Sequence, residues 1–325
     1  MEELARFSFR PAWWGPNRHV QTCFGPVVRR RFQRLPDYRR EVWDTPDDDF
    51  LELYFHHGDG DKPWVILLHG LEGGVDSFYL TGLTKTMAGL GWNTVVMLFR
   101  TCGASMNRAR RTYHMGEWTD LAFVVGQLNA RFDAPMLFLA GVSLGGNVIA
   151  KWLGEMGDAV PENLRAAAVI SPPFDPSISA PGFHRVLGGL YAKRFFGTLV
   201  PKALAKAQQY PGLLDEAAIR RCRDFTCFDT VVTARLHGFE DGEDYWRKVG
   251  CGQYLSGVRR PLLLVASGDD PFNEHVPLPE ETASASPWLH PLFTRRGGHV
   301  GFVQRDGRSW AEAQVRRFFQ AYAGP

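Results

Sequence analysis

A serine lies between two glycines in the stretch GVSLGGN (141–147), directly after the apolar run MLFLA (136–140). The apolar run is typical of a buried strand, and the residues after the motif have the composition of a helix. A chain that passes from strand to helix in so few residues needs glycines where a Cβ would collide with a neighbour. The pattern predicts that Ser143 stands at the tip of the turn, where its hydroxyl can act as a nucleophile. The alternative is a glycine-rich turn with an incidental serine.

A serine hydroxyl is a weak nucleophile unless a base removes its proton. The stretch RRGGHVGF (295–302) places His299 in a glycine-rich loop, just ahead of the last helical stretch of the chain. The stretch PLLLVASGDDPF (261–272) is an apolar run that ends in two aspartates. Ser, Asp, His is one of the chain orders in which such triads occur. We therefore expect His299 to accept the proton of Ser143, and an aspartate to fix the tautomer of the imidazole.

Asp269 and Asp270 are both candidates for this acid. The acid of such a triad lies where a strand has ended and a turn begins, and Pro271 marks that turn. We choose Asp270 for this reason, and we expect Asp269 to cap or hydrogen-bond the loop.

Acyl transfer also needs N–H donors for the negative charge that develops on the substrate oxygen. The N–H of Leu144 would lie at the start of the helix that follows the serine, where backbone N–H groups favour an anion. The stretch LLHGLEGG (67–74) follows another apolar run, and we expect the N–H of Leu71 to be the second donor. His69 in the same stretch is interpreted as a structural loop residue and not as a base.

Unbroken apolar runs, as expected of strands buried on both faces, occur at 64–69, 93–99, 136–140, 166–171 and 261–267. Amphipathic stretches between and after them are predicted helices, at 77–91, 116–132 and 309–323. Residues 38–44 and 50–56 are predicted to form an antiparallel hairpin at the edge of the sheet. The alternation predicts an α/β fold with a mostly parallel sheet flanked by helices on both faces.

Residues 172–260 interrupt this alternation and are richer in Pro, Phe and Arg. We interpret the chain as a single domain over residues 1–325, with 172–260 as a helical cap inserted in it. The apolar-basic stretch 185–207 is suited either to a membrane surface or to packing on the body beneath. The basic runs at 29–34 and 108–111 fit anionic partners, but a solvated surface explains them more simply.

The composition is that of an ordinary globular protein, because 45% of the 325 residues are hydrophobic, 22% are charged and the net charge is +2. This charge balance gives no indication of nucleic-acid binding. No apolar stretch is long enough for a membrane span or a signal peptide, so we expect a cytoplasmic protein with, at most, peripheral membrane contact. The five cysteines form no CxxC pair, and we expect free thiols. No HExxH pattern occurs, so we expect no metal site at the histidines. The Ser-His-Asp mechanism needs neither a metal nor an organic cofactor, and we expect none.

Several motifs together resemble the YheT-like and EMB8-like α/β-hydrolases, a family related to the animal ABHD1, ABHD2 and ABHD3 group. Two of them depart from the family pattern, with Arg18 where a proline is usual and Thr101 where a glycine is usual. The matching stretches are GPNRHVQT (15–22), HGLEGGVDSFYL (69–80), FRTCGASMNRARRTYHMGEWTDL (99–121), GVSLGGN (141–147), FDTVVTARLHGFEDGEDYW (228–246), SGDDPF (267–272) and GGHVGF (297–302).

The resemblance implies an α/β-hydrolase fold and hydrolysis of carboxylic esters, with acylglycerols or other acyl lipids among the substrates of some members. It carries Ser143, Asp270 and His299 over as nucleophile, acid and base. The phenylalanines of residues 172–260 favour a small-molecule ester with an apolar acyl group. Two alternatives remain: an acyltransferase of the same fold, and a ligand-binding protein without chemistry.

Overall fold

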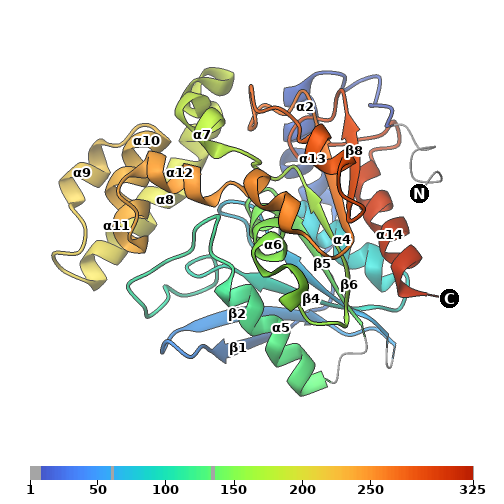
Figure 1. Ribbon diagram of the computed structural model, residues 1–325. Coiled ribbons are helices and arrows are strands. Elements are labelled where there is room, and N and C mark those ends of the chain that lie inside the picture. The colour runs from blue at the N-terminus through green and yellow to red at the C-terminus, as the bar shows by residue number, and fades with distance from the viewer. Residues whose placement is uncertain (1–8, 60–61, 133–135, 325) are drawn as a thin grey trace.

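Eight strands form one sheet in the order β1-β2-β4-β3-β5-β6-β7-β8. The computed structural model describes residues 9–59, 62–132 and 136–324 (Figure 1). Neighbouring strands from β4 to β8 pair in parallel, whereas β2 is antiparallel to β4 and β1 is antiparallel to β2. This topology confirms the predicted α/β class and the predicted hairpin at the edge of the sheet.

The strands agree closely with the predicted apolar runs, and one strand, β8, was not predicted. The strands are β1 (Arg39–Asp44), β2 (Phe50–His56), β3 (Trp64–Leu68), β4 (Asn93–Leu98), β5 (Leu137–Val142), β6 (Leu164–Ile170), β7 (Leu262–Ser267) and β8 (Leu289–Thr294). The α-helices described outside the segment between β6 and β7 are α2 (Arg18–Phe24), α3 (Arg30–Phe32), α4 (Phe78–Ala88), α5 (Thr119–Phe132), α6 (Leu144–Met156), α13 (Glu280–Ser284) and α14 (Trp310–Ala323).

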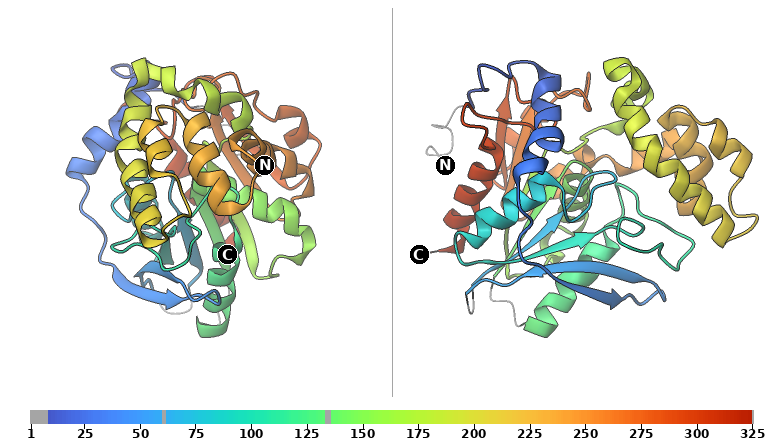
Figure 2. Two further views of the ribbon diagram at one scale, coloured as in Figure 1. Left: turned by 90° about the vertical axis from the view of Figure 1, so that its left-hand side faces the viewer. Right: turned by 180° about the vertical axis from the view of Figure 1, so that it is seen from behind.

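The chain between β6 and β7 is helical, and most of it stands on one side of the sheet (Figures 1 and 2). Its α-helices are α7 (Pro176–Ser179), α8 (Leu190–Gln209), α9 (Glu216–Arg221), α10 (Phe225–Phe228), α11 (Ala234–His237) and α12 (Gly242–Val249). We call residues 176–249 the cap and the rest of the described chain the body. The 3-10 helix Cys251–Gly257 belongs to the body, because a Cβ on Gly154 of α6 would lie 2.1 Å from the carbonyl oxygen of Tyr254.

Two cysteines of the cap are paired. Cys222 and Cys227 form a disulfide between the end of α9 and α10, whereas Cys23, Cys102 and Cys251 are free. The expectation that all five cysteines are free thiols is therefore wrong for this pair. No sequence pattern predicts this pairing, since the partners are only five residues apart and form no CxxC motif.

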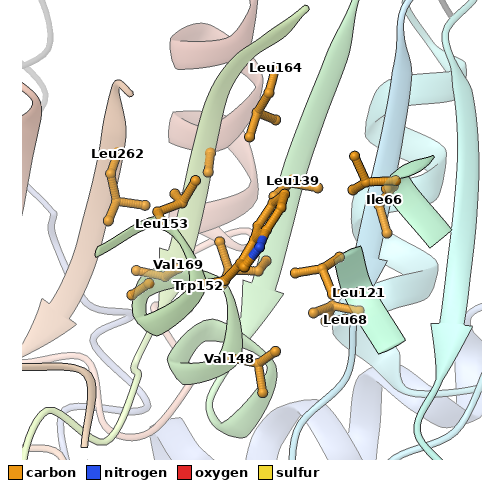
Figure 3. Close-up of a cluster of buried hydrophobic side chains, with 14 of the residues drawn as sticks. Ile66, Leu68, Leu121, Leu139, Val148, Trp152, Leu153, Leu164, Val169 and Leu262 are labelled. Atoms are coloured by element: carbon orange, nitrogen blue, oxygen red, sulfur yellow. The ribbon is translucent and has the colours of Figure 1, made fainter. Parts of the chain in front are cut away.

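Helices cover both faces of the sheet, because alternate side chains of each buried strand point to opposite sides. On one face α5 and α6 pack against the sheet, and Trp152 of α6 lies among side chains such as Leu139 and Val169 (Figure 3). On the other face, α4 and α14 pack against Val65, Leu67 and other inward residues. With both faces buried, the sheet is left with its strand ends as the place for polar side chains that meet solvent or a ligand.

Candidate active site

The turn between β5 and α6 has the geometry that the glycines predicted. Ser143 has φ 54° and ψ −119°, a backbone conformation that costs about 1–3 kcal/mol and persists where the surroundings enforce it. A Cβ on Gly141 would lie 2.4 Å from the carbonyl oxygen of Gly145, and a Cβ on Gly145 would lie 2.6 Å from that of His69. Side chains at these two positions would therefore force the turn apart.

The loop after β3 lies against this turn. A Cβ on Gly70 would be 3.2 Å from the Cβ of Ser143, so the loop backbone closely approaches the serine. Leu71 and Leu144 line the same cavity as Ser143, and within the described residues their N–H groups donate to no acceptor. Two unpaired donors beside one hydroxyl are what an oxyanion hole requires.

The His69 side chain holds the loop after β3 in place through both of its ring nitrogens. The N–H of Phe99 donates to its Nε2 at 3.0 Å, so the ring proton is on Nδ1, which donates to the Gly70 carbonyl oxygen at 2.7 Å. Burial lowers the pKa of His69 to about 4, which keeps the ring neutral at physiological pH. Both ring nitrogens are thus occupied by backbone groups, in line with a structural role.

Asp270 and His299 are brought together from loops 29 residues apart. His299 Nδ1 lies 2.9 Å from Oδ2 and 3.1 Å from Oδ1 of Asp270, and it is the donor because a carboxylate only accepts. The carboxylate also accepts from the N–H of Phe272 at 2.8 Å and from Asn273 Nδ2 at 3.1 Å. The Phe272 ring stacks on the imidazole with centroids 4.1 Å apart. The imidazole is therefore fixed in orientation, and its Nε2 is left to accept a proton.

Asp269 does not contact the imidazole. Its Oδ1 accepts from the N–H of Gly298 at 2.9 Å, so it ties the end of β7 to the loop that carries His299. This is the loop-bonding role expected for the aspartate that is not the acid.

Sequence reasoning missed two residues that hold the histidine loop. Thr22 of α2 accepts from the N–H of His299 through its Oγ1 at 2.9 Å. Gln21 is fully enclosed, and its Oε1 accepts from the N–H of Val303 at 2.7 Å while its Nε2 donates to the Gly15 carbonyl oxygen at 2.7 Å. The sequence signal available for these two residues was the stretch GPNRHVQT (15–22), which resembles a family motif. Its residue types and spacing do not by themselves indicate a catalytic arrangement.

Ser143 and His299 line one cavity but are not hydrogen-bonded to each other. Among the described residues, neither Ser143 Oγ nor His299 Nε2 has any hydrogen-bond partner, so both atoms are available for the contact. Catalytic hydrogen bonds are commonly long without substrate and tighten when it binds. The nucleophile–base contact itself stays a prediction.

The sequence matches the family described as "alpha/beta hydrolase fold" over residues 63–306. It is 33% identical to "Putative esterase YheT" of Escherichia coli K12, over 94% of this chain and 91% of that protein. The chain belongs to the α/β-hydrolase family, in its YheT-like branch. The hydrolase is also 27% identical to "Monoacylglycerol lipase" of Saccharomyces cerevisiae (87% of this chain, 64% of that protein) and 26% identical to "Phospholipase ABHD3" of Bos taurus (91% and 74%). The Pyrococcus furiosus esterase Pf2001 shares the fold, with a TM-score of 0.60 at 17% identity over 89% of this chain and 93% of that one.

The cavity of this hydrolase lies between the body and the cap and has a volume of about 440 Å³. The body contributes the serine, the histidine and the loop after β3. The cap contributes mostly aromatic and aliphatic side chains, including Phe183, Phe195, Leu199, Phe225, Phe228 and Trp246. Such walls favour an apolar ligand with a few fixed polar contacts.

Two charged groups that the cap places in the cavity wall, Lys202 and Asp229, already have protein partners. Lys202 Nζ donates to Glu72 Oε1 at 2.9 Å, and Glu72 belongs to the loop after β3. Asp229 accepts from Thr233 Oγ1 at 2.6 Å and from Trp246 Nε1 at 2.8 Å. Burial raises the pKa of Asp229 to about 6, against these two hydrogen bonds, which favour the charged form.

Residues 9–59, 62–132 and 136–324 of the hydrolase contain no group of three or more His, Cys, Asp and Glu side chains arranged to hold a metal ion. None of the helices described there is long and apolar enough to cross a bilayer.

Proposed function

We propose that the protein is a serine hydrolase of carboxylic esters. Ser143 Oγ attacks the ester carbonyl while His299 Nε2 takes its proton, and the N–H groups of Leu71 and Leu144 stabilise the oxyanion. His299 then protonates the departing alcohol. Water, deprotonated by the same imidazole, releases the acid from the acyl-enzyme. No metal or organic cofactor takes part. One observation carries the proposal: the oriented Asp270–His299 pair and the strained turn of Ser143 open onto one cavity.

We further propose that the acyl group of the substrate is apolar, as in an acylglycerol or another acyl lipid. The aromatic walls of the cap support this, because burial of an apolar chain stabilises binding by about 25 cal/mol per Å². The names of two relatives, a monoacylglycerol lipase and a phospholipase, agree with this substrate class.

A fluorophosphonate probe tests the chemistry, because it reacts covalently only with an activated serine. We expect labelling of the folded protein at Ser143, no labelling of Ser143→Ala, and strongly slowed labelling of His299→Ala. Thermal unfolding of each variant shows whether it is folded. A folded wild-type protein that resists the probe contradicts the proposal.

A series of p-nitrophenyl esters with acyl chains from two to sixteen carbons tests the substrate class. We expect kcat/KM to rise with chain length beyond the shortest esters, because each buried methylene contributes about 0.8 kcal/mol. A preference for acetate over all longer chains contradicts the apolar acyl group and leaves the serine chemistry intact.

A further inference from the structure

Three residues mark the mouth of the cavity, because they line it and are also exposed to solvent. Pro26 and Arg30 lie in the N-terminal helical segment, and Arg194 lies in α8 of the cap. The two segments touch, since His19 Nδ1 is 3.1 Å from the hydroxyl of Tyr191. Figure 2 (left) shows the blue N-terminal helices beside the yellow-green helix α8. We call residues 13–35 and 176–214 the rim.

The rim carries only positive charge. It contains ten of the 37 Lys and Arg residues of the chain and none of its 35 Asp and Glu residues. Some of these cations are neutralised by acids elsewhere, as Arg29 is by Glu312 and Arg18 is by Glu274. Within the described chain, the exposed rim cations that form no ion pair are Arg31, Arg34, Arg185, Lys193 and Arg194.

The rim also holds almost all of the exposed large apolar side chains. Phe32 is 82% exposed and Leu190 is 58% exposed, one on each side of the mouth. The other rim members of this set are Trp13, Val20, Val27, Val28, Leu35, Ile178 and Leu187. Outside the rim, the described chain exposes Val42 alone among residues of this kind. Such a concentration marks an interaction surface, because exposed apolar side chains are normally scattered.

The combination of charge and apolar side chains identifies the partner. Exposed Trp, Phe and Leu next to unpaired Lys and Arg is the composition of helices that lie in the interface of an anionic bilayer. A nucleic acid would use the cations, but the exposed valines and leucines would have no favourable contact with it. We propose that the rim docks the protein on anionic membrane surfaces, with the mouth of the cavity facing the lipid. If the proposed esterase function is correct, an acyl chain can then enter the cavity without crossing water.

Vesicle sedimentation with the full chain tests the docking. The Ser143→Ala protein is used so that the lipids stay intact, with vesicles of phosphatidylcholine alone or with about a third phosphatidylglycerol. We expect binding to the anionic vesicles at least tenfold tighter than to the neutral ones. The double variants Phe32→Asp/Leu190→Asp and Arg31→Glu/Lys193→Glu should each weaken this binding at least tenfold, since each cation near the surface contributes about 1 kcal/mol. None of these four residues lines the cavity.

Matched controls separate docking from folding and from charge in general. Val42→Asp and Arg316→Glu replace an exposed apolar residue and an exposed cation outside the rim, and should change vesicle binding less than twofold. With Ser143 restored, the rim variants should hydrolyse a short soluble ester like the wild type. Equal binding to both vesicle types, or unchanged binding by the rim variants, overturns the proposal. The proposal is also overturned if the protein binds a short RNA duplex, and if Arg31→Glu/Lys193→Glu abolishes this binding while Phe32→Asp/Leu190→Asp does not. Vesicle binding by Ser143→Ala does not depend on whether the protein is an esterase.

Discussion

The body and the cap both place polar side chains in the wall of the cavity, but they hold them differently. In the body, Ser143 Oγ and His299 Nε2 have no protein partner among the described residues, and the two residues lie in the loops that follow β5 and β8. In the cap, Asp229 and Lys202 are occupied by hydrogen bonds or an ion pair. Reactive groups must be free to meet a substrate, whereas partnered groups serve the structure. We infer that the body supplies the chemistry and that the cap supplies the shape of the site.

Beside the cavity, the body and the cap are joined by a buried polar contact, which we call the seam. Lys206 of α8 is fully buried, and its Nζ donates to the carbonyl oxygen and the Oδ1 of Asn107 and to the carbonyl oxygen of Ala109, at 2.8–3.1 Å. Asn107 in turn donates to Asp49, whose carboxylate also pairs with Arg100 at 2.7 Å. The cap is therefore anchored to the loop after β4, and the walls of the cavity are fixed relative to the reactive groups.

Replacing the acid is expected to have the largest effect on the body. In Asp270→Asn the amide no longer favours the imidazolium or the reactive tautomer, so kcat for a soluble ester should fall about 10⁴-fold. Asp269→Asn is the matched control, because an amide oxygen can still accept from the N–H of Gly298. It should change kcat less than tenfold. A large loss in Asp269→Asn together with a small one in Asp270→Asn would identify Asp269 as the acid.

Asp229→Asn tests whether the cap is only structural. The pKa of Asp229 is about 6 in the folded protein and 3.8 for a free side chain. At pH values between these two, the folded state therefore binds more protons than the unfolded state. The free energy of unfolding should therefore fall as the pH rises from about 4 to 6, by on the order of 2–3 kcal/mol. An asparagine keeps a partner for Trp246 and for the Thr233 hydroxyl but does not titrate.

Urea unfolding of wild type and Asp229→Asn across pH 4–8 measures this difference. The free energy of unfolding of the variant, relative to that of the wild type, should increase as the pH rises from about 4 to 6. Above pH 6 this difference should stay constant. A gap that does not depend on pH would show that burial does not oppose the charge. If the folded variant also lost fluorophosphonate labelling of Ser143, the cap would take part in the chemistry, and the division of roles would fail.

The sequence predicted most of the body because its signals are local. The turn at Ser143 needs glycines at fixed spacing, and the buried strands need unbroken apolar runs, so both are visible in a short window. β8 was missed because it is an edge strand with Pro291 in its middle and outward-facing residues that are only partly buried. The choice of Asp270 over Asp269 rested on Pro271, and the structure does place Asp270 against the imidazole.

The support of the site could not be predicted, since it depends on contacts between distant segments. Thr22 bonds to the backbone of His299 across 277 residues, and Lys206 bonds to Asn107 across 99. No local pattern reports such pairs. Burial of Lys206 contradicts the usual exposure of lysine, and only the four acceptors around it make this possible.

Thr101 lies in the loop after β4, to which the cap is anchored, and it offers the test with the smallest expected effect, because it separates backbone strain from side-chain packing. It has φ 70°, a left-handed conformation that costs an L residue about 1–2 kcal/mol and glycine almost nothing. This strain is consistent with the glycine that the family resemblance implies at this position. Thr101→Gly should therefore be more stable than Thr101→Ala by about 1 kcal/mol, the reverse of the usual order. At Thr86 inside helix α4, the same pair should show alanine ahead by about 1 kcal/mol. Urea unfolding of the four variants measures both differences. If the alanine variant were the more stable one at both positions, the loop at Thr101 would relax to relieve the strain, and the seam would be less rigid than the contacts of Lys206 imply.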